Sequence, residues 1–339
     1  MPYFMYVSIS GEDKILIYQM DPVSGHLEKL NEVVSAGRPA PLAASPDRRF
    51  LYVGRREANE ISSFSIDHGT GGLSLLGTAP LESDPCFLST DRQGKFLLSS
   101  YYNAGHAAVH PIDASGVAGS PTIEWLATGT GAHSIQTDPS NRYAFVPHID
   151  NRGGPNAIFQ FRFDPATGHL TPNSPPRVAQ PPQAGPRHFC FHPSKNILYF
   201  SNEQGCSITG YNFNPSDGTL SAFQTISTLP AGFQGTNSCS QIQISPNGKF
   251  LYAPNRGHNS IAGFAVDAAT GQLTALGQTP SEPTPRAFSL DPQGKFLYSA
   301  GLGSGRLAAF SIDSNSGRLT PLETYAVGAD PMWVLITEL

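Results

Sequence analysis

The sequence predicts an all-β protein made of seven repeated units, and two recurring patterns carry this prediction. The first pattern is a turn followed by an aromatic-rich strand, as in residues 45–54 and 291–300. When the copies are aligned on the third residue of the strand, successive copies lie 46 to 54 residues apart. Repeats of that length are typical of stacked units rather than separate domains. The aligned positions are Tyr6, Tyr52, Leu98, Phe145, Tyr199, Tyr252 and Tyr298.

The second pattern is a turn in which an acidic residue or Asn leads to Gly-x-Leu. Asp and Asn bond their own following backbone and Gly adopts positive φ, so the pattern predicts a tight turn between two strands. The copy at 113–119 departs from the pattern. The regular copies span residues 21–27, 67–73, 164–170, 214–220, 267–273 and 313–319.

Residues 39–80 show how one repeat is built. Their pattern predicts strands at 39–45, 50–54, 60–66 and 73–78. Four antiparallel strands in one repeat match one blade of a propeller. Seven repeats therefore predict a seven-bladed β-propeller that occupies residues 1–339 as a single domain.

The two ends of the chain are predicted to share one blade. Residues 331–337 align with the first strand of the other repeats, while residues 3–30 supply the remaining strands of that blade. Pairing the C-terminal strand with the N-terminal strand would close the ring and remove an exposed sheet edge.

Composition argues against several function classes. Charged residues make up 14% of the chain and the net charge is −5, which disfavours a broad surface for nucleic acid or for anionic membranes. No apolar run reaches the roughly 20 residues of a membrane helix, and residues 2–10 read as a strand rather than a signal peptide. The four cysteines form no C-x-x-C pair and lie mostly in or near predicted strands, so we interpret them as small core residues of a protein in a reducing compartment. We expect a cytoplasmic protein.

The functional site is expected on one face of the ring. Successive strands alternate in direction, so the two recurring turns fall on one face and the remaining connections on the other. Those connections are irregular, as in 101–106, 148–156 and 229–239. Function usually lies where a rigid scaffold holds irregular loops, so we expect the site on this face, over the central channel.

Equivalent positions at the start of the innermost strand lie six residues before the turn position that Pro46 occupies. Three of the seven are His or Arg, in a strand otherwise built of small and apolar residues. One such residue alone fits a solvated rim position, whereas three in register favour a binding site. The positions are Ala40, Cys86, His133, Arg187, Ser240, Arg286 and Met332.

A second set of equivalent positions lies at the end of the second strand, four residues after the aligned aromatic position. These residues should surround the same mouth of the channel. They are Ser10, Arg56, Tyr102, Ile149, Glu203, Arg256 and Leu302, with Asn103 and His148 next to them.

Together the two sets predict a site suited to an anionic substrate, because Arg offers planar charged forks for carboxylate or phosphate. Glu203 fits either a general base acting on water or an ion-pair partner of Arg256. His133 fits either an acid–base role or a structural one. The predicted centre is His133, Arg187, Glu203 and Arg256, surrounded by Arg286, Arg56, His148 and Asn103.

A metal or cofactor site is not predicted. The chain has ten histidines but no H-x-x-x-H or H-E-x-x-H pattern, and His192 belongs to a turn on the opposite face. There is no Gly-x-Ser-x-Gly elbow, and residues 301–305 resemble a phosphate loop only in composition.

Over essentially its whole length, the chain resembles the cytoplasmic 6-phosphogluconolactonases of the seven-bladed propeller type, which share a superfamily with fungal carboxymuconate cyclases. The most specific segments are 100–105, 131–134, 184–193, 201–203, 253–256, 284–288 and 325–333.

The resemblance implies hydrolysis of 6-phosphoglucono-δ-lactone to 6-phosphogluconate in the pentose phosphate route, without a metal. In the cyclase branch a His, two Arg and a Glu are proposed as the site, and the matching residues here are His133, Arg187, Glu203 and Arg256. In this view Arg187 and Arg256 stabilise the oxyanion and Glu203 or His133 activates water. Arg286 and Arg56, with His148, would then hold the phosphate.

Two other functions stay open at this point. A lactonase or cycloisomerase acting on a non-phosphorylated carboxylated ring, such as a muconolactone, would use the same Arg cluster. A non-catalytic binding platform would instead present aromatic residues on the loop face, for which Tyr101, Tyr102 and Phe233 are the candidates. We expect a small anionic lactone as the partner, no nucleic acid and no membrane, and a monomer or weak homodimer.

Overall fold

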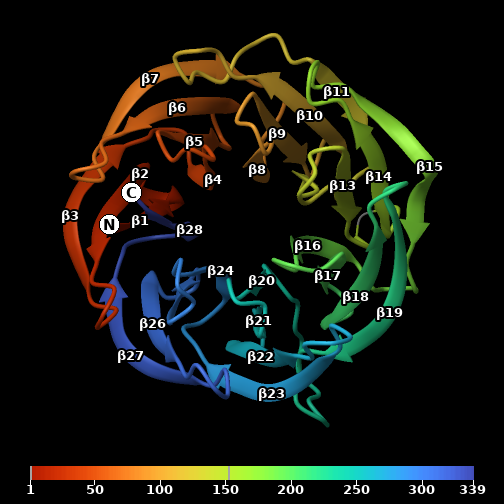
Figure 1. The fold of residues 1–339 in the computed structure, drawn as a ribbon. Coiled ribbons are helices and arrows are strands. Elements are labelled where there is room, and N and C mark those ends of the chain that lie inside the picture. The colour runs from red at the N-terminus through yellow and green to blue at the C-terminus, as the bar shows by residue number, and fades with distance from the viewer. Residues whose placement is uncertain (1, 152) are drawn as a thin grey trace.

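The computed structural model describes residues 2–151 and 153–339, which form seven four-stranded antiparallel sheets arranged in a ring (Figure 1). The predicted seven-bladed β-propeller is therefore confirmed. The helical content of the described residues is one short 3-10 helix, η1 (Ser10–Glu12). No helix in this part of the chain is long and apolar enough to cross a membrane.

Each blade runs from an inner strand beside the channel to an outer strand at the rim (Figure 1). The first three blades in chain order consist of β28 (Pro331–Glu338), β1 (Tyr3–Ile9), β2 (Lys14–Met20) and β3 (Leu27–Val34); β4 (Pro39–Ala44), β5 (Phe50–Arg55), β6 (Glu60–Ile66) and β7 (Leu73–Pro80); and β8 (Phe87–Thr90), β9 (Phe96–Tyr101), β10 (His106–Pro111) and β11 (Glu124–Ala127).

The remaining four blades follow the same order from channel to rim. They consist of β12 (Gln136–Thr137), β13 (Tyr143–His148), β14 (Ala157–Phe163) and β15 (Leu170–Ala179); β16 (Pro186–Phe191), β17 (Ile197–Asn202), β18 (Ser207–Asn214) and β19 (Thr219–Ser227); β20 (Gln243–Ile244), β21 (Phe250–Asn255), β22 (Ser260–Val266) and β23 (Leu273–Pro280); and β24 (Pro285–Leu290), β25 (Phe296–Gly301), β26 (Arg306–Ile312) and β27 (Leu319–Ala326).

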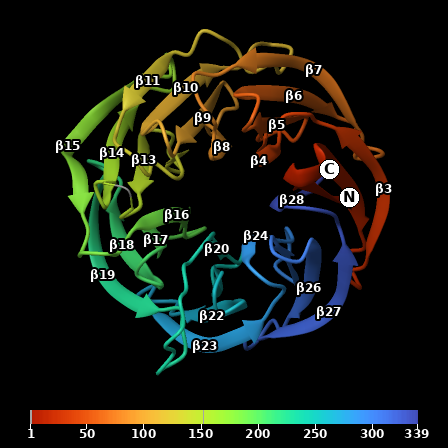
Figure 2. The same cartoon turned by 180° about the vertical axis from the view of Figure 1, so that it is seen from behind.

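The ring closes as predicted, because β28 pairs with β1 in antiparallel register from Tyr3 opposite Glu338 to Ser8 opposite Trp333. Both views place the N- and C-termini beside each other in this blade (Figures 1 and 2). The closure brings Met332 and Trp333 to the channel beside residues that lie far away in the sequence.

The hydrophobic core lies between neighbouring blades. One cluster joins the last blade to the first, with Tyr298 and Leu307 packed against Met5 and Leu16. The other blade pairs are joined by similar clusters, so the apolar side chains fill the gaps between sheets and leave polar residues for the channel mouth. Burial of this kind supplies most of the favourable free energy of folding.

Four of the aligned positions link one blade to the next through a tyrosine hydroxyl. The buried Tyr252 hydroxyl donates to the Gly317 carbonyl at 2.7 Å, in the tight turn of the following blade. Tyr6, Tyr199 and Tyr298 make the same bond to Gly71, Gly271 and Gly25. Each of these glycines has positive φ, as the turn requires. The tyrosine of the first sequence pattern therefore bonds to the turn glycine of the second pattern across the blade boundary.

Tyr52 is the exception among these tyrosines. Its hydroxyl is buried and finds no partner among the described residues. The turn that follows in the next blade is the copy at 113–119, which departs from the Gly-x-Leu pattern. The missing bond thus coincides with the one irregular turn of the series.

This difference gives a test of the interblade bond. Tyr252→Phe should lower the free energy of unfolding by about 1–2 kcal/mol, because the buried Gly317 carbonyl loses its donor. Tyr52→Phe removes a hydroxyl without a partner and should cost less than about 0.5 kcal/mol. Denaturant unfolding of both variants measures the difference, and equal losses would contradict the interblade role.

Candidate active site

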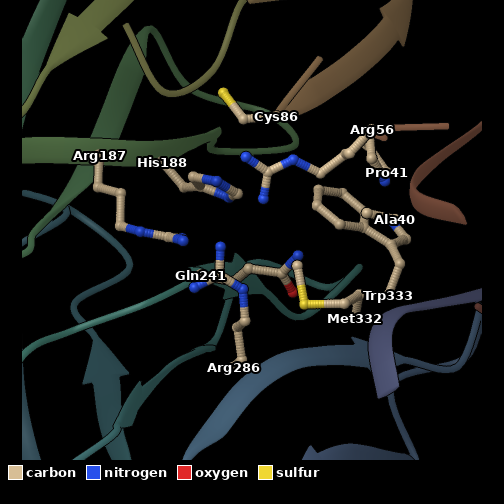
Figure 3. A pocket seen from close by; sticks show the side chains of 10 residues that line it. All are labelled: Ala40, Pro41, Arg56, Cys86, Arg187, His188, Gln241, Arg286, Met332 and Trp333. Atoms are coloured by element: carbon tan, nitrogen blue, oxygen red, sulfur yellow. The ribbon is translucent and has the colours of Figure 1, made fainter. Parts of the chain in front are cut away.

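Two adjoining cavities occupy one mouth of the central channel. The larger, which we call the mouth cavity, has a volume of about 240 Å³ and is lined by Arg56, Cys86, Tyr102, Asn103, His133, Glu203, Arg256 and Arg286. The smaller, the floor cavity, has a volume of about 10 Å³ and is lined by Ala40, Pro41, Arg56, Cys86, Arg187, His188, Gln241, Arg286, Met332 and Trp333 (Figure 3). The two sets of equivalent positions found in the sequence therefore supply much of both linings.

Glu203 lies at the centre of the site between two guanidinium groups. Its Oε2 accepts from Arg187 Nε at 2.7 Å, and its Oε1 lies 3.0 Å from Arg256 Nη2. His133 Nε2 lies 4.0 Å from Oε2. The loop that carries Glu203 is fixed on both sides, since its N–H donates to the Gly185 carbonyl and its carbonyl accepts from the Cys239 N–H.

Burial shapes the charge state of this cluster. Burial raises the pKa of Glu203, but the charges of Arg187 and Arg256 outweigh it, so the net pKa lies below the ordinary value and the carboxylate stays ionised. Arg187 is only 2% exposed, and burial is the main cause that lowers its pKa to about 9. At neutral pH the ion pair is therefore fully charged.

Arg286 carries a positive charge that has no ion-pair partner within the described chain. It lines both cavities, and burial, together with the charges of Arg256 and Arg56, lowers its pKa to about 10. Arg56 pairs with Asp84 at 2.5 Å. Four guanidinium groups in the site thus face two carboxylates, which leaves two positive charges uncompensated.

The two histidines of the site are uncharged at neutral pH. Burial and then the charge of Arg187 hold the pKa of His133 and of His188 well below the ordinary value. Their rings contact each other edge to face, with centroids 5.3 Å apart. The Tyr102 ring packs against His133 from the mouth side, at 5.6 Å.

Seven of the eight predicted site residues line the two cavities, and His148 does not. His148 is completely buried in β13, with Nδ1 donating to the Val146 carbonyl at 3.0 Å and Nε2 accepting from the Thr128 hydroxyl at 2.9 Å. Its ring packs against Phe159. Because neighbouring strand residues point to opposite faces, its position beside Ile149 does not bring it to the channel.

The sequence patterns did not single out His188, Gln241 or Trp333, which also line the floor cavity. Each follows directly after a position of the first set. At Arg187, Arg286 and Met332 the pairing of the inner strand with its neighbour is interrupted by a β-bulge. A bulge lets two consecutive residues face the same side, which strict alternation forbids. The sequence signal that could have found these three residues is the position that follows each member of the first set along the inner strand.

The buried state of His148 predicts how stability depends on pH. Burial lowers its pKa to about 4, whereas an unfolded chain has an imidazole pKa near 6.5. Between these values the unfolded state binds more protons, so stability should fall as the pH drops from about 6.5 to 4, by up to about 3 kcal/mol for this group.

His148→Gln removes this proton uptake and should flatten the loss, measured by denaturant unfolding at a series of pH values. Part of the loss should remain, because the pKa of buried His110 is also lowered to about 4. His68→Gln, which also removes an exposed imidazole, is the matched control and should follow the wild-type curve. An unchanged slope in His148→Gln would refute the assignment.

Comparison with known proteins places the chain in a family. A family model described as "Lactonase, 7-bladed beta-propeller" matches residues 4–336. A 6-phosphogluconolactonase of Pectobacterium carotovorum is 36% identical over 339 residues, all of both chains, and one of Serratia proteamaculans is 36% identical over 336 residues, 99% of each.

Solved structures agree with this placement. The periplasmic gluconolactonase of Pseudomonas aeruginosa superposes with a TM-score of 0.91 at 27% identity, covering 99% of each chain. A putative 6-phosphogluconolactonase of Bacteroides fragilis superposes with a TM-score of 0.90 at 25% identity, covering 99% of this chain and 98% of that one. The protein described here therefore belongs to the family of seven-bladed β-propeller lactonases.

Proposed function

We propose that the protein hydrolyses 6-phosphoglucono-δ-lactone to 6-phosphogluconate at the mouth cavity. The observation that carries this proposal is the excess of positive charge there, with Arg286 lacking an ion-pair partner among the described residues. Arg286 is half-buried, and a charge partly removed from water is costly unless a ligand of opposite sign completes it. Relatives of the chain are named 6-phosphogluconolactonase, and the phosphorylated lactone in that name is an anion that fits the positive charge of the site.

The phosphate of the substrate is proposed to bind Arg286 and Arg56. Both side chains reach the two cavities, and Figure 3 shows their guanidinium groups converging on the same space. Asp84 holds Arg56 and also accepts from the amide of Asn103 at 3.4 Å, so these residues form one supported edge of the mouth. Guanidinium forks match phosphate oxygens well.

The lactone carbonyl is proposed to lie between Arg256 and His133. Hydrolysis places negative charge on the carbonyl oxygen, and fixed donors in a site shielded from water stabilise that charge strongly. Arg256 Nη2 also donates to the Cys239 carbonyl at 2.7 Å, which fixes the guanidinium, and its Nε is buried with no partner in the described residues.

Glu203 is assigned to holding the guanidinium groups rather than to accepting a proton. Each of its oxygens already lies against an Arg side chain, and its lowered pKa makes it a weak base. Of the two roles that the sequence left open for Glu203, the contacts favour the ion pair. Its partners Arg187 and Arg256 are kept in place by it.

A gluconolactone without phosphate is the second candidate substrate, because a periplasmic gluconolactonase has nearly the same fold. A carboxylated muconolactone would use the same charges.

The binding platform is disfavoured by the contacts: Tyr101 is fully buried, Tyr102 packs on His133 and Phe233 packs on His258. Action in the cytoplasmic pentose phosphate route, as a monomer or weak homodimer without a metal, is part of this proposal.

A substrate panel tests the phosphate assignment. We expect kcat/KM for 6-phosphogluconolactone to exceed that for gluconolactone and for a muconolactone by about 100-fold, the scale of one or two lost charge-assisted contacts, and we expect a chelator to change nothing. Arg286→Met should raise KM for the phosphorylated lactone and leave gluconolactone hydrolysis nearly unchanged. Arg177→Met removes an exposed charge away from the site and serves as the control.

Equal rates on all three lactones would refute the phosphate subsite, and a chelator-sensitive rate would refute the metal-free reaction.

The Glu203 assignment makes a separate prediction. Glu203→Gln keeps the shape but removes the charge that holds Arg187 and Arg256, so kcat/KM should fall by about 100-fold. Because the carboxylate is not the proton acceptor in this proposal, the pH profile of the residual activity should keep the acidic limb of the wild type. Steady-state kinetics across pH measures both, and near-normal activity would contradict the assignment.

A further inference from the structure

The floor cavity has the dimensions of a site for a single water molecule. Its volume of about 10 Å³ is close to the least that accommodates one water. It lies deeper than the mouth cavity, because its lining residues His188, Gln241 and Trp333 follow the first set of positions along the inner strands. Trp333 also lines a separate pocket together with residues of β4 and β8, so its side chain borders both spaces.

Three buried polar atoms of the lining side chains lack partners among the described residues, namely Arg187 Nη1, His188 Nε2 and Arg56 Nε. Arg187 Nη1 and His188 Nε2 are both buried and make no hydrogen bond to any described residue. The side chains are 2% and 4% exposed, and both point into the floor cavity in Figure 3. A buried water needs two to four polar partners, and an unpaired buried polar group is costly. A water bound to both atoms would satisfy each of them.

The His188 ring is held in one orientation. Phe87 meets it edge to face with centroids 5.0 Å apart, Trp333 packs on it at 6.1 Å and His133 at 5.3 Å. The Ser201 hydroxyl donates to its backbone carbonyl at 3.3 Å. These contacts fix the ring nitrogen relative to Arg187 without occupying it.

The roles of the two atoms follow from their chemistry. Arg187 Nη1 can only donate, so it would bond the oxygen of the water and orient it. An uncharged imidazole has one nitrogen with a free lone pair, which would accept a proton of the same water. The titratable groups around His188 are His133, Cys86, Arg56, Arg187, Arg256 and Arg286. Glu203 contacts two of them, Arg187 and Arg256.

Binding of the anionic substrate should strengthen the imidazole as a base. Burial and then the charges of Arg187, Arg286 and Arg256 keep the pKa of His188 low in the free protein. A phosphate bound to Arg286 and Arg56 would offset part of this positive field, so the proton affinity of the ring rises when substrate is present.

We propose that the floor cavity holds the hydrolytic water and that His188 is the general base that activates it. This inference rests on the proposed lactone hydrolysis. A proton of the water passes to His188 Nε2 while the water oxygen bonds to the carbonyl carbon. The ring C–O bond then breaks, and the leaving oxygen takes the proton back from the imidazolium. The product is the open hydroxy acid, which loses its acidic proton to solvent.

Replacing His188 by Gln tests the proposal, because the amide can still hold water but cannot take up its proton. We expect kcat to fall by at least 100-fold, in line with the loss of a general base, with KM and the affinity for 6-phosphogluconate within about threefold of wild type. The acidic limb of the kcat profile should vanish in His188→Gln and persist in His133→Gln. His169→Gln, at an exposed site, should behave as wild type.

A kcat within threefold of wild type in His188→Gln overturns the proposal, as does an acidic limb that is lost in His133→Gln instead. Calorimetric binding of 6-phosphogluconate shows whether the variant has kept its fold, and a crystal structure of the wild-type protein adds an independent test. The crystal structure should show a water between Arg187 Nη1 and His188 Nε2, and an empty floor cavity overturns the proposal.

The kinetic measurements use both 6-phosphogluconolactone and gluconolactone. Hydrolysis of gluconolactone alone would refute the phosphate subsite, while His188 would still be tested on that substrate. Hydrolysis of neither lactone by the wild-type protein would overturn both proposals.

Discussion

Closure of the ring by β28 and β1 holds the seven blades, and with them the channel mouth, in place. A propeller blade buries its faces only against its neighbours, and an open ring would leave two blades with one uncovered face each. The pairing of Tyr3 to Ser8 with the C-terminal strand completes the blade that joins the two chain ends, so every blade face meets a neighbour. It also fixes seven inner strands around one axis, so that side chains from distant repeats meet at one mouth.

The interblade bonds from tyrosine to turn carbonyl give this ring a regular pitch. Tyr298 bonds to Gly25 across the closing boundary in the same way that Tyr6 bonds to Gly71 further along. The same bond at several blade boundaries means that the scaffold does not depend on the residues of the channel. The channel mouth can therefore carry side chains that reduce stability.

The candidate active site contains such destabilising side chains. Four guanidinium groups near one another repel, and removing them from water is costly, so a folded chain keeps such a cluster only if the scaffold compensates for it. Glu203 pairs with two of the guanidinium groups and Asp84 with a third, so two negative charges face four positive ones. The remaining field attracts an anion, and together with burial, the larger cause, it keeps both histidines uncharged, so one arrangement serves substrate binding and supplies a neutral base.

Sequence patterns alone predict the repeat, the four strands per blade, the closure of the ring and the two sets of positions at the channel mouth. This was possible because hydrophobic alternation and turn chemistry are local, and because every repeat places equivalent residues at equivalent points. Seven of the eight residues named from those positions line the cavities, among them Arg187, Glu203 and Arg256.

The direction in which individual side chains point follows from the packing of the blades and not from the repeat. His148 turns into its blade to meet Thr128, although its neighbour in sequence lies at a site position. Arg187 and His188 both face the channel because a β-bulge breaks the alternation between them. The pairing of Arg56 with Asp84 and the water-sized space beneath Arg286 likewise arise from contacts between repeats. Such contacts depend on the packing of several blades at once, and no local pattern encodes them.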